Sequence, residues 1–464
     1  MTYGSKPTAA PHEDAEELQV VRKAYRRVVW FLVVLFICSY LDRINMSFAA
    51  LSMNKDLGLN ATMFASAASI FYIAYVAAEI PSNMMLPRFG AKIWIPRIMI
   101  TWGMASAATA LAVGPNSLYV LRALVGLAEA GFMPGILLYM TYWFPPVYLA
   151  RASALFIMAQ PITIMFGSFV SGGILEMNGV LGLAGWQWLF ILEGLPSVIF
   201  GVIAYFYLSN TPADAAWLAA REKQVLIAAV ERGGKSSATG SARSIVRDIL
   251  SWPVALLALT YFCLTVSLAT NSAWVPQIVR GVVPDGSYAL VGFVTAIPSF
   301  VTICVMPFWG DHSDRRQERI AHVILPMLLA GLGWSFVALF EVPLLKFVGL
   351  VFCSVGGFAA QSIFWTLPPN YLSPEARPIG IAFVNTIGLL GTTTGLMVMG
   401  WLRDLTHSFA AGLLFVAGCM VTGSVFVFLI SGWSGKSLTT LRIKPPRCTG
   451  PLGGKVSVDS NREK

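Results

Sequence analysis

Charged side chains are scarce in this sequence. Lys, Arg, Asp and Glu make up 12% of the 464 residues, whereas hydrophobic residues make up 56% and the mean hydropathy is +0.69. A soluble globular chain carries about 25% charged residues. The composition therefore excludes an ordinary soluble domain and predicts an integral membrane protein.

Cysteine and histidine are also few. The six Cys form no Cys-x-x-Cys pair, and the four His have no metal-ligand spacing. We therefore expect neither a disulfide framework nor a metal site, and no cofactor. Ser, His and Asp show no catalytic-triad pattern, so we do not expect an enzyme. The first 27 residues contain no short apolar segment of the signal-peptide kind, and the first spanning helix is expected to direct insertion.

The positive charge has a one-sided distribution. The net charge is +9, and 26 of the 32 Lys and Arg lie in the N-terminal tail, alternate loops, the long middle loop and the C-terminal tail. An excess of Lys and Arg marks the cytoplasmic side of a membrane protein. The basic balance thus predicts topology and not a nucleic-acid partner. Both termini are expected to be cytoplasmic, and the protein is expected in the plasma membrane, the inner membrane if bacterial.

Apolar runs separated by polar breaks predict twelve spanning helices. They lie at 28–50, 62–86, 94–113, 117–141, 153–177, 187–209, 251–275, 288–309, 321–341, 345–368, 378–402 and 409–432. The predicted organisation is an N-terminal tail (1–27), a six-helix bundle (28–209), a cytoplasmic middle loop (210–250), a second six-helix bundle (251–432) and a C-terminal tail (433–464). Asn60 begins a glycosylation sequon on the predicted outward side, which matters only in a eukaryotic host.

The two halves of the chain resemble each other. A shift of 226 residues places Gly131-Phe132 on Gly357-Phe358 in the fourth and tenth predicted helices. Internal repeats of this kind are typical of transporters. The same shift places Glu129 on Val355, so the buried charges belong to the first half. We expect the first half to handle charge and the second to select by hydrogen bonding.

Two pairs of opposite charges lie inside apolar runs: Asp42 and Arg43 in the first, Arg122 and Glu129 in the fourth. Ionisable residues at membrane depth usually mark an ion or substrate route. On a helix, Asp42 and Asn45 share a face while Arg43 is turned by about 100°. A guanidinium fork suits a carboxylate, and a buried carboxylate near an arginine can exchange a proton. The alternative is that the four residues only form salt bridges that fasten the two helices.

Longer motifs surround these residues. Tyr40-Leu-Asp42-Arg43-Ile-Asn45, Arg122-Ala-Leu-Val-Gly-Leu-Ala-Glu129, Glu79-Ile-Pro-Ser-Asn83 and Arg97-Ile-Met-Ile-Thr-Trp102-Gly together resemble the anion:cation symporter family of the major facilitator superfamily, nearest the tartrate and phthalate branch. The resemblance runs from about Tyr25 to Gly432. It implies an all-α membrane protein of the major facilitator fold, with twelve transmembrane helices in two six-helix bundles.

The resemblance also implies roles for individual residues. Asp42 and Glu129 would carry the proton, Arg43 would hold the substrate carboxylate, and Arg122 and Asn45 would complete the charge network. The remaining substrate-binding positions that it implies are Tyr75, Gln160, Ser362, Trp365 and Asn385. Aromatic residues in spanning helices also serve as packing or interface anchors, which is the competing interpretation of Tyr75 and Trp365.

One motif departs from the superfamily pattern. The cytoplasmic motif after the second helix normally carries a Gly and an Asp, and Asn83 and Pro87 occupy these places before Arg88. The second copy keeps Gly310 and Asp314 before Arg315. Arg88, Asp314 and Arg315 are the expected cytoplasmic gate residues, and the first-half gate cannot use the usual Asp contact.

The predicted function is import of a small organic anion, such as a tartrate-, phthalate- or hydroxyphenylacetate-like carboxylate, by proton symport through alternating access. The expected partners are the carboxylate, protons and the bilayer, with the monomer as the functional unit. The alternative within transport is a proton-coupled antiporter that exports drugs or metabolites. A membrane sensor with a transporter fold is a third possibility, but the middle loop and the tail offer no elaborated cytoplasmic domain.

Overall fold

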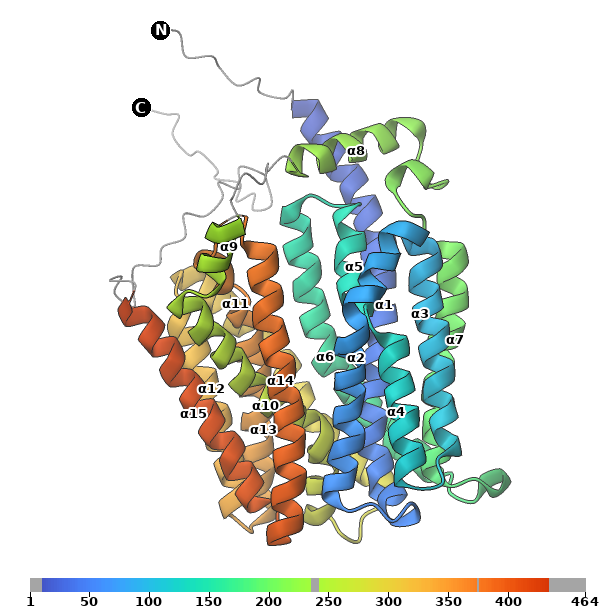
Figure 1. Ribbon diagram of the computed structural model, residues 1–464, viewed down its shortest axis with the longest axis vertical. Coiled ribbons are helices and arrows are strands. Elements are labelled where there is room, and N and C mark those ends of the chain that lie inside the picture. Colours follow the sequence, from blue (N-terminus) through green and yellow to red (C-terminus); the bar gives the residue numbers. More distant parts are fainter. Residues whose placement is uncertain (1–10, 235–241, 374, 434–464) are drawn as a thin grey trace, which may run out of the picture.

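The computed structural model describes residues 11–234, 242–373 and 375–433, and its regular structure there is helical (Figure 1). The first seven helices are α1 (Pro11–Asp56), α2 (Ala61–Phe89), α3 (Ala91–Ala108), α4 (Pro115–Glu129), α5 (Phe132–Thr141), α6 (Pro146–Leu175) and α7 (Gly185–Tyr207). The last six are α10 (Trp252–Val282), α11 (Tyr288–Arg316), α12 (Ile320–Leu339), α13 (Pro343–Phe364), α14 (Arg377–Thr406) and α15 (Ala410–Trp433). Within the middle segment lie α8 (Ala220–Gly234) and α9 (Ala242–Ile249).

The described part of the chain confirms the twelve predicted spans. Eleven segments are long and apolar enough to cross a membrane, with α4 and α5 counted as one. The twelfth is α3, which carries Lys92 and Arg97 and packs against α4 and α7. Its charged residues lie near one end, so the rest of the helix can still be enclosed by its neighbours.

The fourth predicted helix, 117–141, is not continuous. It divides into α4 and α5 at Gly131, whose φ of 83° is a left-handed conformation that favours glycine. A Cβ at Gly131 would lie 2.5 Å from Ser82 Oγ. The break therefore comes from a close approach of α2, which an apolar run does not reveal.

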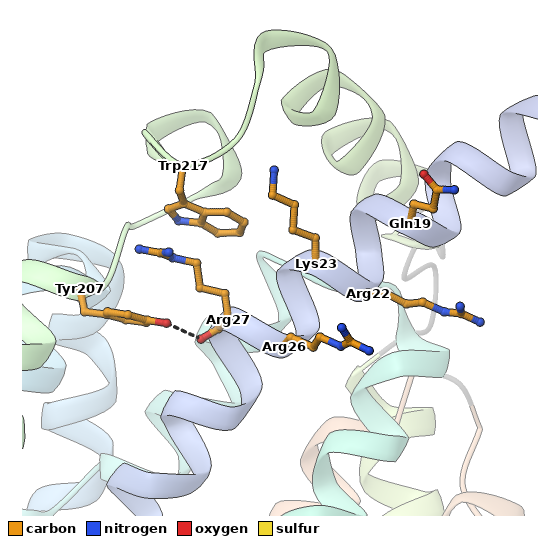
Figure 2. A pocket seen from close by; sticks show the side chains of 7 residues that line it. All are labelled: Gln19, Arg22, Lys23, Arg26, Arg27, Tyr207 and Trp217. Atoms are coloured by element: carbon orange, nitrogen blue, oxygen red, sulfur yellow. Dashed lines mark hydrogen bonds between the residues drawn. The ribbon is translucent and has the colours of Figure 1, made fainter.

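The first helix begins earlier than its apolar run. Residues 11–27 of the predicted N-terminal tail continue α1, and Figure 2 shows this polar end beside the segment that contains α8. Lys23 Nζ lies 2.8 Å from Glu222 Oε2 on α8, and the Arg27 guanidinium lies 5.1 Å from the ring centre of Trp217. Part of the predicted middle loop thus forms a helix, α8, that packs beside the start of α1. The predicted C-terminal tail, apart from Trp433, lies outside the described residues.

The helices form two groups, α1–α7 and α10–α15 (Figure 1). Within the groups, α3 packs on α7 and α12 packs on both α13 and α15. Between them, α6 packs on α11, α2 on α14 and α1 on α10. These three contacts enclose the space between the groups.

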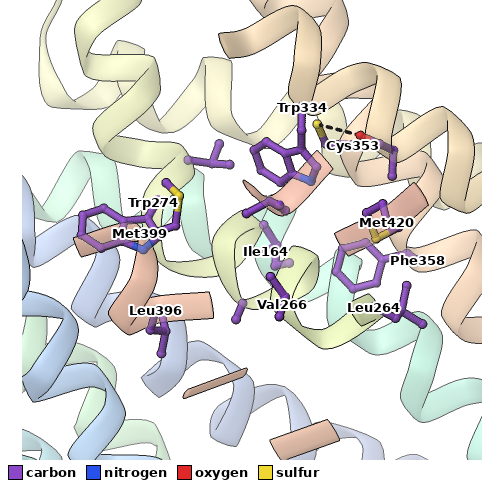
Figure 3. Close-up of a cluster of buried hydrophobic side chains, with 14 of the residues drawn as sticks. Ile164, Leu264, Val266, Trp274, Trp334, Cys353, Phe358, Leu396, Met399 and Met420 are labelled. Atoms are coloured by element: carbon purple, nitrogen blue, oxygen red, sulfur yellow. Dashed lines mark hydrogen bonds between the residues drawn. The ribbon is translucent and has the colours of Figure 1, made fainter. Parts of the chain in front are cut away.

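Large side chains fill the core of the second group (Figure 3). Trp334 of α12, Phe358 of α13 and Met420 of α15 are each at most 1% exposed. The indole Nε1 of Trp334 donates to Ser267 Oγ of α10 at 2.8 Å, so its polar atom is paired. Large apolar side chains therefore pack the centre of this half, and the polar atom of Trp334 within it has a partner.

Candidate functional site

Asp42 lies in a polar pocket formed by three helices. Its carboxylate accepts hydrogen bonds from the indole of Trp102, from Ser106 Oγ at 2.6 Å and from Ser197 Oγ at 3.2 Å. Asn45 Nδ2 donates to the same carboxylate at 3.0 Å, as the shared helix face predicts. The side chain of Asp42 is almost completely buried. Four donors from α1, α3 and α7 thus replace the water that a carboxylate would otherwise bind.

Two glycines bring α3 and α7 close enough to build this pocket. A Cβ at Gly103 would lie 2.8 Å from the carbonyl oxygen of Gly194, and one at Gly194 would lie 2.9 Å from that of Gly103. Small residues allow helix backbones to approach in a membrane. Because Trp102 and Ser197 lie on either side of this crossing, the close approach positions both donors on Asp42.

Arg43 points to a different partner from Asp42. Its Nη2 lies 2.8 Å from Glu129 Oε1 of α4, and its Nε lies 3.3 Å from the same oxygen. Ser39 Oγ donates to that oxygen as well, at 2.8 Å. Glu129 is 1% exposed, whereas the side chain of Arg43 is 26% exposed. Glu129 is therefore the enclosed member of the pair, and Arg43 is the partly exposed one.

Arg122 lies on the other side of the site. Its Nη2 donates to Thr109 Oγ1 at 3.1 Å, and its guanidinium carbon lies 5.2 Å from the ring centre of Phe190 on α7. Within the described residues its Nε has no partner. Arg122 forms no salt bridge among the described residues, so the structure does not support the interpretation that it fastens α1 to α4.

A cavity of about 40 Å³ joins these residues. Its walls come from both groups of helices: Asp42, Arg43, Met46, Ser47, Phe64, Ala68, Phe71, Tyr72, Arg122, Ala269, Ser272, Ala273 and Leu396. This volume holds a few water molecules. A larger cavity of about 630 Å³ lies at the polar end of α1, lined by Arg22, Arg26 and their neighbours, well outside the buried charge network.

The other predicted binding residues lie at varied distances from this cavity. Tyr75 is buried beside it, with its ring centre 5.8 Å from the Arg43 guanidinium carbon. Gln160 on α6 and Asn385 on α14 are half-buried. Ser362 Oγ bonds to its own helix at the Ala359 carbonyl, and Trp365 packs on Tyr261 at 4.7 Å between ring centres. The structure thus brings Tyr75 to the charged cluster. The other predicted binding residues, Gln160, Ser362, Trp365 and Asn385, are not part of the cavity wall.

The predicted gate residues do not meet one another. Asp314 Oδ1 lies 2.5 Å from Arg319 Nη2, and Arg315 Nη2 lies 2.6 Å from Asp311 Oδ2. Arg88 is exposed at the end of α2. In this conformation the second copy of the motif is bonded locally.

At the end of the helices away from the predicted gate residues, the two groups of helices contact each other. The Asp404 carboxylate of α14 accepts from the backbone N–H of Ala61 at 3.0 Å and of Thr62 at 2.8 Å, at the first turn of α2. A Cβ at Gly172 of α6 would lie 2.6 Å from the Tyr288 carbonyl oxygen of α11. A carboxylate at a helix N-terminus is favoured by the unpaired amides and the helix dipole. The end far from the N-terminus of the chain is therefore sealed.

Several polar residues of the site were not predicted. Trp102, Ser106 and Ser197 hold Asp42, and Ser39 holds Glu129. Gln361 is only 7% exposed, whereas its predicted neighbour Ser362 is more open. A further carboxylate, Glu193 on α7, is 1% exposed and bonded to Ser171 Oγ at 2.6 Å. Glu193 is a charged residue in an apolar run, and the argument used for Asp42 would have found it.

Comparison with known proteins decides the family. The profile of the Major Facilitator Superfamily matches residues 32–396. The chain belongs to this superfamily. It is a multi-pass membrane transporter and not an enzyme.

Three relatives from bacteria carry names that describe transport. A protein of Agrobacterium vitis named "Putative tartrate transporter" is 40% identical over 91% of this chain and 94% of its own length. The "Putative metabolite transport protein NicT" of Pseudomonas putida is 35% identical over 88% and 94%. The "Quinolone resistance transporter" of Acinetobacter baumannii is 31% identical over 93% and 99%.

Solved structures show the same fold. A bacterial homologue of the human lysosomal transporter Spinster, in an inward-facing and occupied conformation, matches with a TM-score of 0.68 at 16% identity, covering 87% of this chain and 96% of that one. The xylose transporter XylE of E. coli, partially occluded and inward open, also matches with a TM-score of 0.68, at 13% identity, over 88% and 98%. These matches confirm the major facilitator architecture.

Proposed function

We propose that this member of the superfamily imports a small organic carboxylate together with protons. The observation that carries the proposal is the Arg43–Glu129 pair, in which the cation faces the cavity and the anion is enclosed. An arginine fork binds carboxylates through paired charge-assisted hydrogen bonds. The similarity to relatives named as tartrate transporters supports the same substrate class.

The pair links substrate binding to proton binding. Glu129 and a substrate carboxylate compete for the guanidinium of Arg43, which lies 2.8 Å from Glu129 Oε1. When Glu129 takes a proton, Arg43 is released to bind the substrate. Protonation and anion binding therefore favour each other, and by reciprocity loss of either weakens the other. Asp42, which lines the same cavity, is the second proposed proton carrier.

The conformation fits one stage of alternating access. With both termini cytoplasmic, as the basic residues predict, the end sealed by Asp404 is the outer one. The cavity of about 40 Å³ is too small for a carboxylate such as tartrate, so the helices must separate before it binds. Because the cavity lies within one chain, we assign transport to the monomer.

Proton-coupled export of drugs is the second candidate, supported by the 31% identity to the quinolone resistance transporter. It differs from the first in the direction of transport. An exporter would move a quinolone out of proteoliposomes as protons enter, whereas an importer would accumulate carboxylate with protons.

The test is uptake of radiolabelled tartrate, phthalate and hydroxyphenylacetate by proteoliposomes under an inward proton gradient. We expect accumulation of one of them that collapses with a protonophore and in Arg43→Ala. Arg22→Ala, which alters an exposed arginine at the end of α1, is the control and should transport normally. Uptake that is independent of the gradient would refute proton symport, and gradient-driven quinolone efflux without carboxylate uptake would establish the second candidate.

A further inference from the structure

Glu193 is a third buried carboxyl group, in addition to Asp42 and Glu129. It lies on α7, is 1% exposed, and accepts one hydrogen bond, from Ser171 Oγ of α6 to its Oε1 at 2.6 Å. Among the described residues its Oε2 has no partner. An ionised carboxylate in such a place costs several kcal/mol unless a cation or several donors compensate it.

The charges around Glu193 do not supply that compensation. Besides Glu193, the buried network includes the carboxylates of Asp42 and Glu129 and the cations of Arg43 and Arg122. Three carboxylates therefore share two guanidinium groups, and Arg43 is already paired with Glu129. Arg122 approaches α7 at Phe190, where its guanidinium carbon lies 5.2 Å from the ring centre, and its Nη2 bonds to Thr109.

Other charged groups on the helices around α7 lie toward the helix ends or have partners of their own. Lys55 of α1, Lys92 of α3 and the basic residues at the polar end of α1 are exposed. On α3, Arg97 lies over the ring of Trp94, with 3.9 Å to the ring centre. At the far ends, Asp56 of α1 accepts from Trp186 at 2.9 Å, and Glu176, just past the end of α6, accepts from the Ala289 amide. A neutral interior therefore favours one proton among the three carboxyl groups. Within the described part of the chain, Glu193 accepts the fewest hydrogen bonds of the three and forms no salt bridge.

A route connects Glu193 to the cavity. Ser197 lies one helical turn beyond Glu193 on α7 and donates to Asp42 Oδ2 at 3.2 Å. Residues four apart on a helix share a face, with about 5–6 Å between their Cβ atoms. One side-chain rotation or one bridging water spans that separation.

We propose that Glu193 is a third proton-carrying group, which exchanges its proton with Asp42 through the Ser197 hydroxyl. In the transfer, the O–H of Glu193 gives its proton to Ser197 Oγ as Ser197 gives its own proton to Asp42. Glu193 becomes an anion and Asp42 becomes neutral, so the total charge is unchanged. The proposal rests on the proposed function for the direction of proton movement, but the protonation of Glu193 can be measured without transport.

The first measurement is infrared spectroscopy of the purified protein in lipid nanodiscs across a pH titration. We expect a C=O stretch of a protonated carboxyl group that shifts in D₂O, disappears in Glu193→Gln, and changes amplitude with pH. Glu341→Gln, which alters an exposed glutamate, is the control and should leave the band intact. A band that Glu193→Gln does not alter, or one that stays constant over the whole titration, would overturn the proposal.

The second measurement separates proton coupling from structure, with tartrate as the probe. In Glu193→Gln and Ser197→Ala we expect proton-driven accumulation to fall at least tenfold, while tartrate exchange between the two sides, which needs no net proton movement, persists. Glu193→Asp, which keeps the carboxyl group, should retain part of the coupling. Equal loss of exchange and accumulation would assign Glu193 a structural role only. Absence of gradient-driven uptake of tartrate, phthalate and hydroxyphenylacetate in the wild type would refute the proposed function, and the infrared result would still decide on Glu193.

Discussion

Replacement of Arg43 by methionine would leave Glu129 enclosed without its cation. The pair is joined at 2.8 Å, and Glu129 is 1% exposed, so water cannot reach it easily. Removal of one partner of a buried ion pair costs about 3–5 kcal/mol, whereas replacement of both partners by neutral groups is often nearly neutral. We therefore expect Arg43→Met to lower the free energy of unfolding by about 3–5 kcal/mol, and Arg43→Met with Glu129→Gln to recover most of it.

The assay combines stability and transport for the two single variants and the double variant. Stability is measured by denaturant-driven unfolding in detergent micelles, and transport by carboxylate uptake under a proton gradient. If the pair only fastens α1 to α4, the double variant should regain both stability and uptake. If the pair binds substrate and proton, stability returns and uptake does not. Normal uptake by the double variant would refute our reasoning, and so would a change in stability below about 1 kcal/mol for Arg43→Met.

Three further predictions follow from the packing and the ends of the molecule. Gly103→Ala should push α3 away from α7, lower the free energy of unfolding by about 1–3 kcal/mol and slow transport. Gly173→Ala is the control, because a Cβ there has nothing within 4 Å, and it should have none of these effects. Equal melting temperatures of the two variants would contradict the close crossing of α3 and α7. Asp404→Ala should lengthen the distance between spin labels on the first turn of α2 and the last turn of α14, since two hydrogen bonds are lost; an unchanged distance distribution would rule out the seal. Hydrogen bonding from Lys23 holds the pKa of Glu222 below its usual range. The stabilisation from this contact of α8 with α1 is therefore complete above the ordinary glutamate pKa of about 4.3 and is lost as the pH falls through the lower folded pKa. Hydrogen exchange of α8 that stays constant at acid pH would disprove this.

The sequence predicts those features of the fold and the site that are determined within a single helix. The helical period places Asp42 and Asn45 on one face and turns Arg43 away. In the structure Asp42 and Asn45 are bonded to each other, and Arg43 is bonded to Glu129 of α4. The twelve spans follow from apolar runs that a bilayer requires. These are local properties, and the structure confirms them.

Features that depend on how helices approach one another were not predictable from the runs. The donors on Asp42 come from α3 and α7 and meet only because Gly103 and Gly194 allow a close crossing. The break at Gly131 arises in the same way, from the approach of Ser82. Glu193 differs, because its charge in an apolar run was visible and only its partner was not.

The bond that Asp404 makes has a consequence for how freely the sequence can vary around it. Its partners are the backbone amides of residues 61 and 62, which every amino acid except proline provides. The contact at this closed end therefore depends on the presence of a helix start and not on the identity of its side chains. Substitutions on the α2 side can accumulate without opening the transporter, while the acid on α14 has no substitute of equal reach and charge.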